Sequence, residues 1–456
     1  MTPEVKQRIE QIQQGIVPKG YKKTKSDIVP VDWKESSIGE YICEYTEKTT
    51  IPNQYPVLTS ARTGLMLQTD YYSNRQVTTE DNVGYNVLPY GYITFRSRSD
   101  DGRFRFNENR IIERGVISYF YPVFSFSEEV CHEYMLYLLN FSIYRRMYPY
   151  AEGTAQQVLS LKKLGQLKYS LPLVAEQKKI AEILATQDKA IELQERKIDE
   201  LKRFKKGCLE KMFPRKGQKV PEKRFPGFTD DWEQRKFDEA FIERRDKTEK
   251  ENEDILLSCA INGMFLNSEL FGHFRGTTTI GYLRVKKNDL ILSAQNLHLG
   301  NANVNLRFEH GIISPAYKVY DLNNCNPEFV QSWVKRDDTK NFFLAATTEG
   351  ASQCRKNIEW ETLGKQTISM PSLDEQKRVG SFFSQLDNLI TLHQRKLEEM
   401  KKQKKALMQL LLTGIVRVQG NRFCCDFRDD EERNARNAVK GVCKQKVKTQ
   451  MKKISQ

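Results

Sequence analysis

The chain repeats itself once over most of its 456 residues, and this repeat constrains the fold more than any other feature. The run PLVAEQKKIAEILATQD, which begins at Pro172, returns as PSLDEQKRVGSFFSQLD from Pro371, a shift of 199 residues. The same shift carries Asp32-Trp33 onto Asp231-Trp232. Self-similarity at a fixed long period marks a repeated structural unit. The sequence therefore predicts two copies of one domain plan in tandem.

Each copy has a front and a back of different character. The front is a patchwork of short alternating runs rich in Tyr, Phe, Val and Ile and punctuated by Gly and Asn, which predicts strands with some helix. The back carries apolar residues at alternating steps of four and three, as in the seam of a coiled coil. These seam positions are Ile180, Leu184, Ile191, Ile198 and Leu201 in the first copy and Val379, Phe383, Leu386, Ile390, Leu397 and Met400 in the second.

The two seams predict two long helices. A helix from Ala175 to Met212 would extend about 57 Å at a rise of 1.5 Å per residue. Ser372 and Glu375 have the spacing of a capping box at the start of the second helix. Because isolated apolar seams are unstable in water, we expect the helices to pack as an antiparallel, coiled-coil-like pair. Two ordinary core helices, or a seam shared with a partner protein's helices, are the alternatives.

These features predict a mixed α/β (α+β) chain with two front domains separated by two long antiparallel helices. The Pro/Gly/Lys-rich joint at 214–227 marks the boundary between the copies. The expected segments are a first front domain at 1–171, a first spacer helix at 172–214, a linker and second front domain at 215–370, a second spacer helix at 371–418, and a tail at 419–456.

The net charge points to a polyanionic partner. Lys and Arg outnumber Asp and Glu by 73 to 59, which gives a net charge of +14, and such a balance favours nucleic acid. An anionic membrane surface or a ribosome would also fit this charge. No apolar run approaches the roughly 18 residues of a membrane span, and the opening MTPEVKQRIEQ is too polar for a signal peptide. We therefore expect a cytoplasmic protein with no membrane partner.

The sequence contains no recognisable catalytic or metal-binding constellation. The nine cysteines form no CxxC pair and the five histidines are isolated, so no metal site is expected. No Pro-Asp dipeptide accompanies Glu176-Gln177-Lys178 or Glu375-Gln376-Lys377, and in the first turn of a helix these carboxylates suit the helix dipole. GxxxxGK[ST] is also absent. We expect neither catalysis nor a bound cofactor from this chain alone.

The stretch FRSRSDDGRFRF at 95–106 is the first candidate for nucleic-acid contact. Asp101-Gly102 is a strong signal for a two-residue hairpin turn. In that register Arg98 lies opposite Arg105, and alternation places the four arginines on one face of the hairpin. The equivalent stretch of the second copy, LSAQNLHLGNANVN at 292–305, carries amides instead. Arginine pairs naturally with guanine or phosphate, whereas Gln and Asn pair with adenine, so the two copies predict different reading chemistry.

The two Glu-Gly-x-x-Gln loops and the basic pairs that follow them are further candidates. The full set of candidate DNA-binding residues is Arg96, Arg98, Arg103, Arg105, Gln156, Lys162, Lys163, Gln295, Asn296, Asn301, Asn303, Gln353, Arg355 and Lys356. Lys335-Arg336 is expected on the exposed face of a helix. Tyr71-Tyr72 is expected in the core.

The doubled pattern resembles a known family. Two copies of Pro-x-x-x-Glu-Gln-Lys, the Asp-Trp near each domain start, FPGFTDDW at 225–232 and LLTGIVRV at 411–418 together are similar to the specificity subunit of a type I restriction-modification system. The resemblance covers about residues 1 to 418. It implies that each front domain is a target-recognition domain for one half of a split, asymmetric sequence in double-stranded DNA, with the helices as spacers.

The resemblance also implies partners. It implies that this chain has no catalytic activity of its own. It also implies that two methyltransferase subunits and two restriction subunits dock on it. S-adenosylmethionine, ATP and Mg would then be bound by those partner subunits. The start of each helix, at Glu176-Gln177 and Glu375-Gln376, and the seams behind them would mark the spacer and docking region. The family fixes no base-reading residue by motif.

One segment departs from the family pattern. Members commonly end near the equivalent of Val418, whereas the 38 residues from Gln419 contain ten Lys/Arg, five Asp/Glu and three cysteines. Such a composition favours a disordered tail, which would be either an extra DNA-contacting arm or the product of a frameshift. A stand-alone DNA-binding protein that self-associates through its helices is the alternative function, and a single enzyme with an unrecognised active site is the third.

Overall fold

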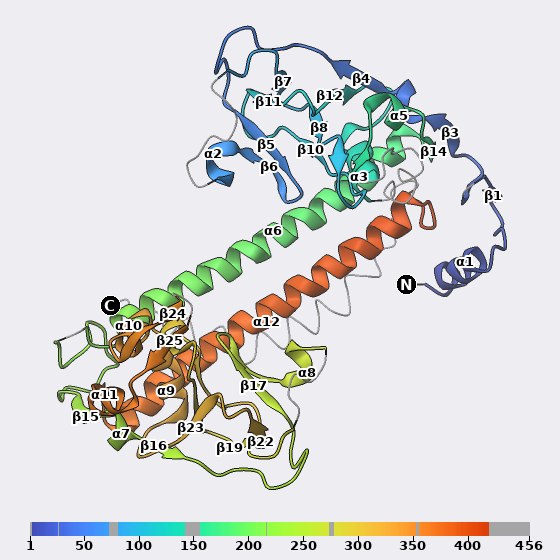
Figure 1. Ribbon diagram of the computed structural model, residues 1–456. Helices are drawn as coiled ribbons and strands as arrows, with labels where there is room; N and C mark the ends of the chain where they lie inside the picture. The colour runs from blue at the N-terminus through green and yellow to red at the C-terminus, as the bar shows by residue number, and fades with distance from the viewer. Residues whose placement is uncertain are drawn as a thin grey trace. The chain divides into compact units, whose positions relative to one another are not determined.

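The computed structural model describes residues 2–25, 27–72, 81–141, 156–215, 217–272, 278–352 and 355–418. The chain divides into two compact units. The first contains the first front domain with the beginning of helix α6 (Val174–Lys211) and the end of helix α12 (Leu373–Leu412). The second contains the second front domain with the end of α6 and the beginning of α12 (Figure 1). The basic tail predicted from Gln419 onward lies outside the described residues.

An antiparallel four-stranded sheet forms the centre of the first front domain, in the order β10-β8-β12-β4. Two-stranded pairs β1-β2, β3-β14, β5-β6, β7-β11 and β9-β13 surround it. The strands are β1 (Tyr21–Lys23), β2 (Ile28–Pro30), β3 (Lys34–Ser37), β4 (Ile42–Tyr45), β5 (Leu58–Ala61), β6 (Gly64–Leu67), β7 (Asn86–Pro89), β8 (Ile93–Phe95), β9 (Arg98–Ser99), β10 (Phe106–Glu108), β11 (Arg114–Ile117), β12 (Val123–Phe126), β13 (Gln157–Val158) and β14 (Lys168–Leu171). The helices are α1 (Pro3–Gln13), η1 (Ile38–Glu40), α2 (Gln68–Tyr71), α3 (His132–Phe141) and α5 (Leu161–Gly165).

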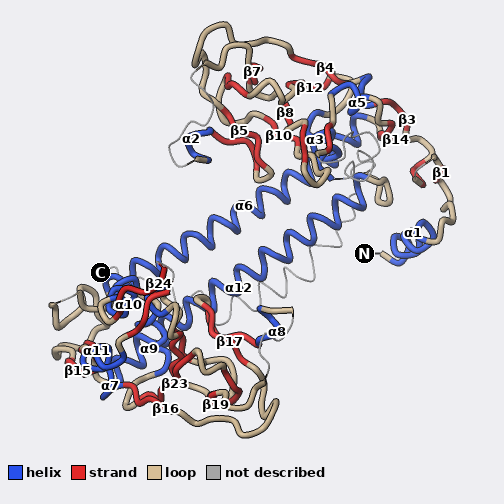
Figure 2. Tube along the Cα trace, in the orientation of Figure 1, coloured by secondary structure: helices blue, strands red, loops and turns tan. Residues whose placement is uncertain are grey.

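The second front domain repeats this plan, with a sheet in the order β16-β23-β20-β21. Its strands are β15 (Glu233–Lys236), β16 (Phe241–Arg244), β17 (Leu257–Ala260), β18 (Gly263–Leu266), β19 (Leu283–Lys286), β20 (Leu290–Ser293), β21 (Ala302–Val304), β22 (His310–Ile313), β23 (Tyr317–Leu322), β24 (Thr347–Ser352), β25 (Arg355–Ile358) and β26 (Thr367–Met370). Its helices are α7 (Phe237–Ala240), α8 (Asn267–Leu270), η3 (Leu297–Leu299), α9 (Pro327–Val334), α10 (Asp337–Leu344) and α11 (Trp360–Lys365). Figure 2 shows strands and helices mixed in both domains. The predicted mixed α/β class and the duplicated plan are therefore confirmed.

Each front domain packs its main core against a long helix. In the first unit Phe95, Phe106 and Phe124 of the sheet join a buried cluster that also contains Ile180 and Leu184 of α6. In the second unit the corresponding cluster includes Val379 and other residues of α12. Burial of such side chains contributes about 1.5 to 3 kcal/mol each. The helices are thus part of the domain cores as well as spacers.

Contacts within each unit show that the two helices run antiparallel. In the first unit Asp188 of α6 pairs with Lys404 of α12, while Glu176, nearer the start of α6, binds the backbone N–H of Val418. In the second unit Gln194 donates to the carbonyl of His393, and the later Lys205 pairs with Asp387. Positions farther along α6 therefore contact positions nearer the start of α12. The antiparallel arrangement is confirmed, and coiled-coil packing of the seam stays a prediction.

The helix starts are held by a buried glutamine in each unit. Gln177 Oε1 accepts a hydrogen bond from Cys131 N at 2.8 Å, and its Nε2 donates to Pro172 O at 2.9 Å. Gln376 makes the matching bonds with Asn326 N at 2.8 Å and Pro371 O at 3.0 Å. The predicted capping box is only half present. Ser372 accepts from Glu375 N, but the Glu375 carboxylate binds Arg224 instead.

The helices begin and end slightly inside the predicted limits. α6 runs from residue 174 to 211 rather than from 172 to 214, and α12 runs from 373 to 412 rather than from 371 to 418. Pro172 and Pro371 thus precede the helices, where a missing N–H is harmless. In the part of the chain that the structure describes, no helix has the length and apolarity needed to cross a membrane.

Candidate nucleic-acid interface

The predicted two-residue hairpin at Asp101-Gly102 is wrong. β8 does pair with β10, but in a register that places Phe95 opposite Phe106, and the residues between them form a long connection. Within that connection β9 pairs with β13, with Arg98 opposite Val158. Phe95 and Phe106 are both buried opposite each other, and β9 pairs with β13 instead of with the residues that follow Gly102.

The four arginines of the connection are exposed, but they have different neighbours rather than one shared face. The Arg98 guanidinium lies 4.4 Å from the centroid of the Phe120 ring. Arg103 lies 3.8 Å from Asp101. Partial burial lowers the pKa of Arg105, and the nearby carboxylate of Asp188 on α6 acts in the opposite direction.

Gln156, which the sequence analysis named as a DNA-binding candidate, contacts the same connection. Its Nε2 donates to Asp100 Oδ1 at 2.8 Å. Asp101 lies beside it in the sequence and binds Arg62 at 2.6 Å. Acidic side chains therefore hold several polar groups of this surface in place. Whether Gln156 contacts DNA stays a prediction.

Exposed aromatic side chains occur in the first domain, and Phe120 lies against Arg98; the sequence analysis did not single out Tyr119 or Phe120. Tyr119 and Phe120 occupy the turn between β11 and β12 and are 56% and 38% exposed. Tyr71 and Tyr72, expected in the core, are 47% and 40% exposed, so that expectation is wrong. Burial raises the pKa of Tyr121, and the charge of Arg96 lowers it. Tyr71 and Tyr72 also raise that pKa.

Two of the amides proposed for the second domain are structural. Asn301 and Asn303 are buried, so their assignment as DNA-binding residues is wrong. Asn303 Nδ2 donates to Ala260 O at 2.7 Å, as Asn107 Nδ2 donates to Ala61 O at 2.8 Å in the first domain. The recurrence of Asn-x-Asn at 107–109 and 303–305 in the sequence was the signal that could have indicated a structural role. An amide shared by both copies serves their common fold.

The other second-domain candidates remain at or near the surface. Gln295 is exposed and Asn296 is half-buried. Gln353 lies outside the described residues, and only the backbone of Arg355 and Lys356 is described, in β25. All of these stay predictions.

Lys162 and Lys163 follow β13, the partner strand of β9, in the sequence. They belong to the short helix α5, which packs closely on η1 where Gly39 meets Gly165. A Cβ on Gly39 would come within 2.9 Å of the Gly165 carbonyl oxygen, so the close approach requires glycine there. Lys162 is exposed and Lys163 is half-buried.

The predicted spacer and docking residues are mostly interior. The seam positions are buried except for Met400, which is half-buried. Glu176, Gln177, Glu375 and Gln376 are at most 6% exposed. Of the seam residues, Ile180 and Leu184 belong to the core of the first domain, and Val379, Phe383 and Leu386 to that of the second. Two leucines at equivalent positions, Leu193 of α6 and Leu392 of α12, are instead 55% and 59% exposed.

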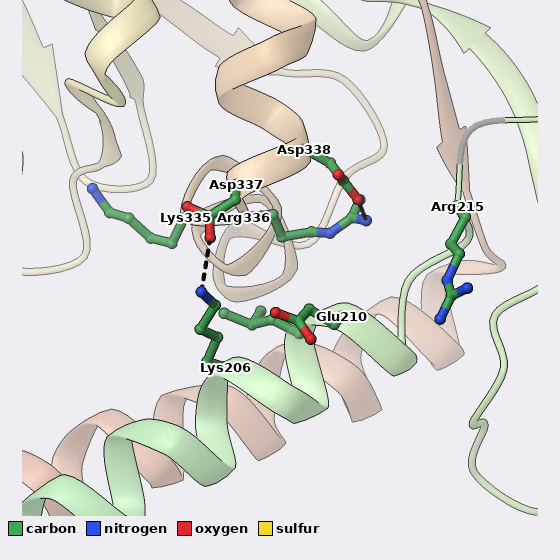
Figure 3. Close-up of a pocket in the computed structure, with 8 residues that line it drawn as sticks. Lys206, Glu210, Arg215, Lys335, Arg336, Asp337 and Asp338 are labelled. Carbon is green, nitrogen blue, oxygen red and sulfur yellow. Dashed lines mark hydrogen bonds and ion pairs between the residues drawn. The ribbon is translucent and has the colours of Figure 1, made fainter.

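A pocket of about 380 Å³ lies in the second unit, where the end of α6 meets the segment between α9 and α10 (Figure 3). Its charges compensate one another, because Lys206 pairs with Asp337 at 3.4 Å and Arg336 with Asp338 at 2.7 Å. Arg336 also lies over the Phe213 ring and is buried. The expectation that Lys335-Arg336 forms an exposed helical face is wrong. Among the described residues no cluster of three metal-ligating side chains occurs.

A family model described as the type I restriction modification DNA specificity domain matches residues 30–203 and 209–402. The chain belongs to this family. Each matched range includes most of one front domain and most of one long helix, in agreement with the internal repeat. Each of the two is thus a DNA specificity domain.

Two curated relatives come from Methanocaldococcus jannaschii. The putative type I restriction enzyme MjaX specificity subunit is 25% identical over 63% of this chain and 68% of its own length. The type I restriction enzyme MjaVIII specificity subunit is 25% identical over 60% and 67%. The chain is accordingly a DNA-recognition subunit with two specificity domains, a non-catalytic part of a restriction-modification enzyme.

A solved structure supports the fold. A chain from a study described as the structural basis underlying complex assembly and conformational transition of the type I R-M system aligns with a TM-score of 0.51. It is 14% identical and covers 85% of this chain and 99% of its own. At this identity the similarity concerns the fold alone.

Proposed function

We propose that this chain reads an asymmetric, bipartite sequence in double-stranded DNA, one half with each specificity domain. The observation that carries the proposal is one scaffold used twice with different surface chemistry. The first domain presents Arg98 and Phe120 where the second presents Gln295 and Ala316. Identical readers would recognise a symmetric target, whereas different readers require different half-sites.

We further propose that the chain docks two methyltransferase subunits, which hold S-adenosylmethionine, and two restriction subunits, which use ATP and Mg. The repeat supports this stoichiometry because it presents each outward-facing helical position twice, as with Leu193 and Leu392. The chain itself would bind no cofactor and would act in the cytoplasm, where its DNA target is found.

The test is methylation-sensitive sequencing of DNA from a host that carries this chain with its neighbouring methyltransferase gene. We expect one bipartite methylated motif. Replacement of residues 1–171 by the front domain of a related subunit should change one half of the motif and leave the other unchanged. A change in both halves would contradict the model of two independent readers.

Two further measurements distinguish the alternatives. The purified chain should neither cut nor methylate DNA when given Mg or S-adenosylmethionine without a second protein, and robust activity would favour a single enzyme. Co-purification should yield methyltransferase subunits in a 2:1 ratio. Homodimers without methyltransferase would favour a stand-alone DNA-binding protein.

A further inference from the structure

The two domains share a surface turn whose geometry identifies equivalent positions. Ser118–Tyr121 and Ser314–Tyr317 are each closed by a bond from the tyrosine N–H to the serine carbonyl, at 2.9 and 3.0 Å. The chain that leaves the central sheet passes beside this turn in both domains. Ser97 Oγ donates to Phe120 O at 2.6 Å, and Ala294 N donates to Ala316 O at 3.1 Å.

The next residue along the chain is therefore also equivalent. It is Arg98 in the first domain and Gln295 in the second, and both are exposed. The turn residue beside it is Phe120 in the first domain and Ala316 in the second. This pair of positions differs in chemistry. The local backbone also differs, because Arg98 begins strand β9 whereas Gln295 lies in the turn before η3.

Phe120 restricts the Arg98 side chain. A guanidinium 4.4 Å from a ring centroid is within the range of a cation–π contact, and stacking leaves the N–H donors at the edge of the guanidinium available. A stacked arginine has lost part of its rotamer freedom before it binds, so less entropy is lost on contact with a base. Among the ion pairs of the described residues none involves Arg98, whereas Arg103 is within reach of Asp101.

We propose that positions 98 and 295 are the equivalent base-reading positions of the two domains. Arg98, oriented by Phe120, reads a guanine in the first half-site, and Gln295 reads an adenine in the second. A guanidinium binds guanine O6 and N7 through two hydrogen bonds, and a glutamine amide binds adenine N6 and N7 in the same way. Phe120 is a positioning residue because it acts through Arg98. The inference rests on the proposed function of each domain as a half-site reader.

The experiment determines the methylated motif of the complete complex for the wild type and for Arg98→Gln, Phe120→Ala, Gln295→Arg and Arg62→Gln. Arg98→Gln should replace one guanine of the first half-site by adenine, and Gln295→Arg should make the reverse change in the second half-site. Arg62→Gln is the control, since this exposed arginine of the same domain binds Asp101 at 2.6 Å, and it should leave the motif unchanged.

Phe120→Ala tests positioning separately from reading. The motif should be retained, while the affinity for it falls about two- to tenfold, the range expected for loss of a cation–π contact. Phe120→Tyr should restore the affinity, and the dependence of binding on salt should not change because no phosphate contact is lost. Loss of affinity without rescue by tyrosine would overturn the positioning role.

A variant that preserves the charge distinguishes loss of base reading from misfolding. Arg98→Lys should keep the protein folded and the second half-site intact, but its discrimination for guanine should fall at least tenfold because lysine lacks the two-pronged geometry. An unchanged motif in both Arg98→Gln and Arg98→Lys would overturn this inference and leave the proposed function standing. If the wild-type complex produces no bipartite motif, the proposed function itself fails.

Discussion

Arg417 binds Glu176 through two parallel hydrogen bonds, from Nε at 2.9 Å and from Nη2 at 2.8 Å, and so joins the segment after α12 to the first turn of α6. The second unit has the same device, in which Arg224 binds Glu375 at 2.6 and 2.7 Å. Hydrogen bonding to the Glu176 carboxylate raises the pKa of Arg417 well above its usual value. Each helix start is therefore neutralised by an arginine that follows the other helix in the sequence.

We predict that Arg417→Ala weakens the first unit and Arg224→Ala the second. Removal of one partner leaves a buried carboxylate, which costs about 3 kcal/mol. Hydrogen exchange should accelerate at residues 174–185 in the first variant and at 373–384 in the second. Each variant is the control for the other, and equal acceleration in both units would contradict the assignment.

Lys335 should make stability depend on alkaline pH. Burial lowers the pKa of its ammonium group from 10.5 to about 8, while Nζ donates to Ile261 O and Ala302 O. Between pH 8 and 10.5 the unfolded chain binds a proton that the folded chain has lost, so this group makes the free energy of unfolding rise with pH. Below pH 8 the cost of burying the charge is fully present.

The measurement is urea unfolding from pH 7.5 to 10.5 for the wild type and Lys335→Met. The difference between them should change by at most about 3 kcal/mol across this range. Burial raises the pKa of Cys259 to about 11, which has the opposite effect on stability, but this thiol is present in both proteins. A constant difference would show that Lys335 remains charged in the folded state.

Two helical glycines should respond oppositely to alanine. A Cβ on Gly380 of α12 would come within 2.5 Å of Asn326 Oδ1 and 2.6 Å of Phe329 N, at the start of α9. Gly207 of α6 has nothing within 4 Å of its Cβ position. Gly207→Ala should stabilise the protein by up to about 1 kcal/mol through helix propensity. Gly380→Ala should lower the melting temperature, and an increase there would contradict the observed close packing.

The exposed leucines test the proposed stoichiometry. If Leu193 and Leu392 each contact one methyltransferase subunit, Leu193→Glu or Leu392→Glu alone should change the co-purified ratio from 2:1 to 1:1. The double variant should bind none, since a charge is costly to bury in an apolar contact. Glu192→Gln is a control on the same exposed turn and should leave the ratio at 2:1. An unchanged ratio in the double variant would exclude these leucines from the interface.

The general plan was predictable because its signals are local or repeated. The seam residues of α6 and α12 recur with helical periodicity, so the two helices and their ends were predicted within six residues. The shift of 199 residues predicted two copies of one domain, and the family match has the same two parts. Arg98 and Gln295, named from the sequence as DNA-binding candidates, are exposed, and their contact with DNA stays a prediction.

The errors all concern contacts between residues that are distant in sequence. Asp101-Gly102 has the composition of a hairpin turn, but Arg98 of β9 pairs with Val158 of β13, far along the chain. Asn303 resembles a base reader until Ala260 is placed beside it. The sequence around β9 or around Asn303 does not indicate that β13 or Ala260 will be the partner.

By itself the sequence determined the duplicated mixed α/β plan, the long helices and the lack of a known catalytic motif, because periodicity and repetition are properties of the chain. Only the tertiary structure decided which polar side chains face solvent and which satisfy buried backbone groups. It also decided that Phe120, 22 residues after Arg98, supports its guanidinium. The physical reason is that burial and stacking depend on the neighbours a side chain acquires when the chain folds, not on those beside it in the sequence.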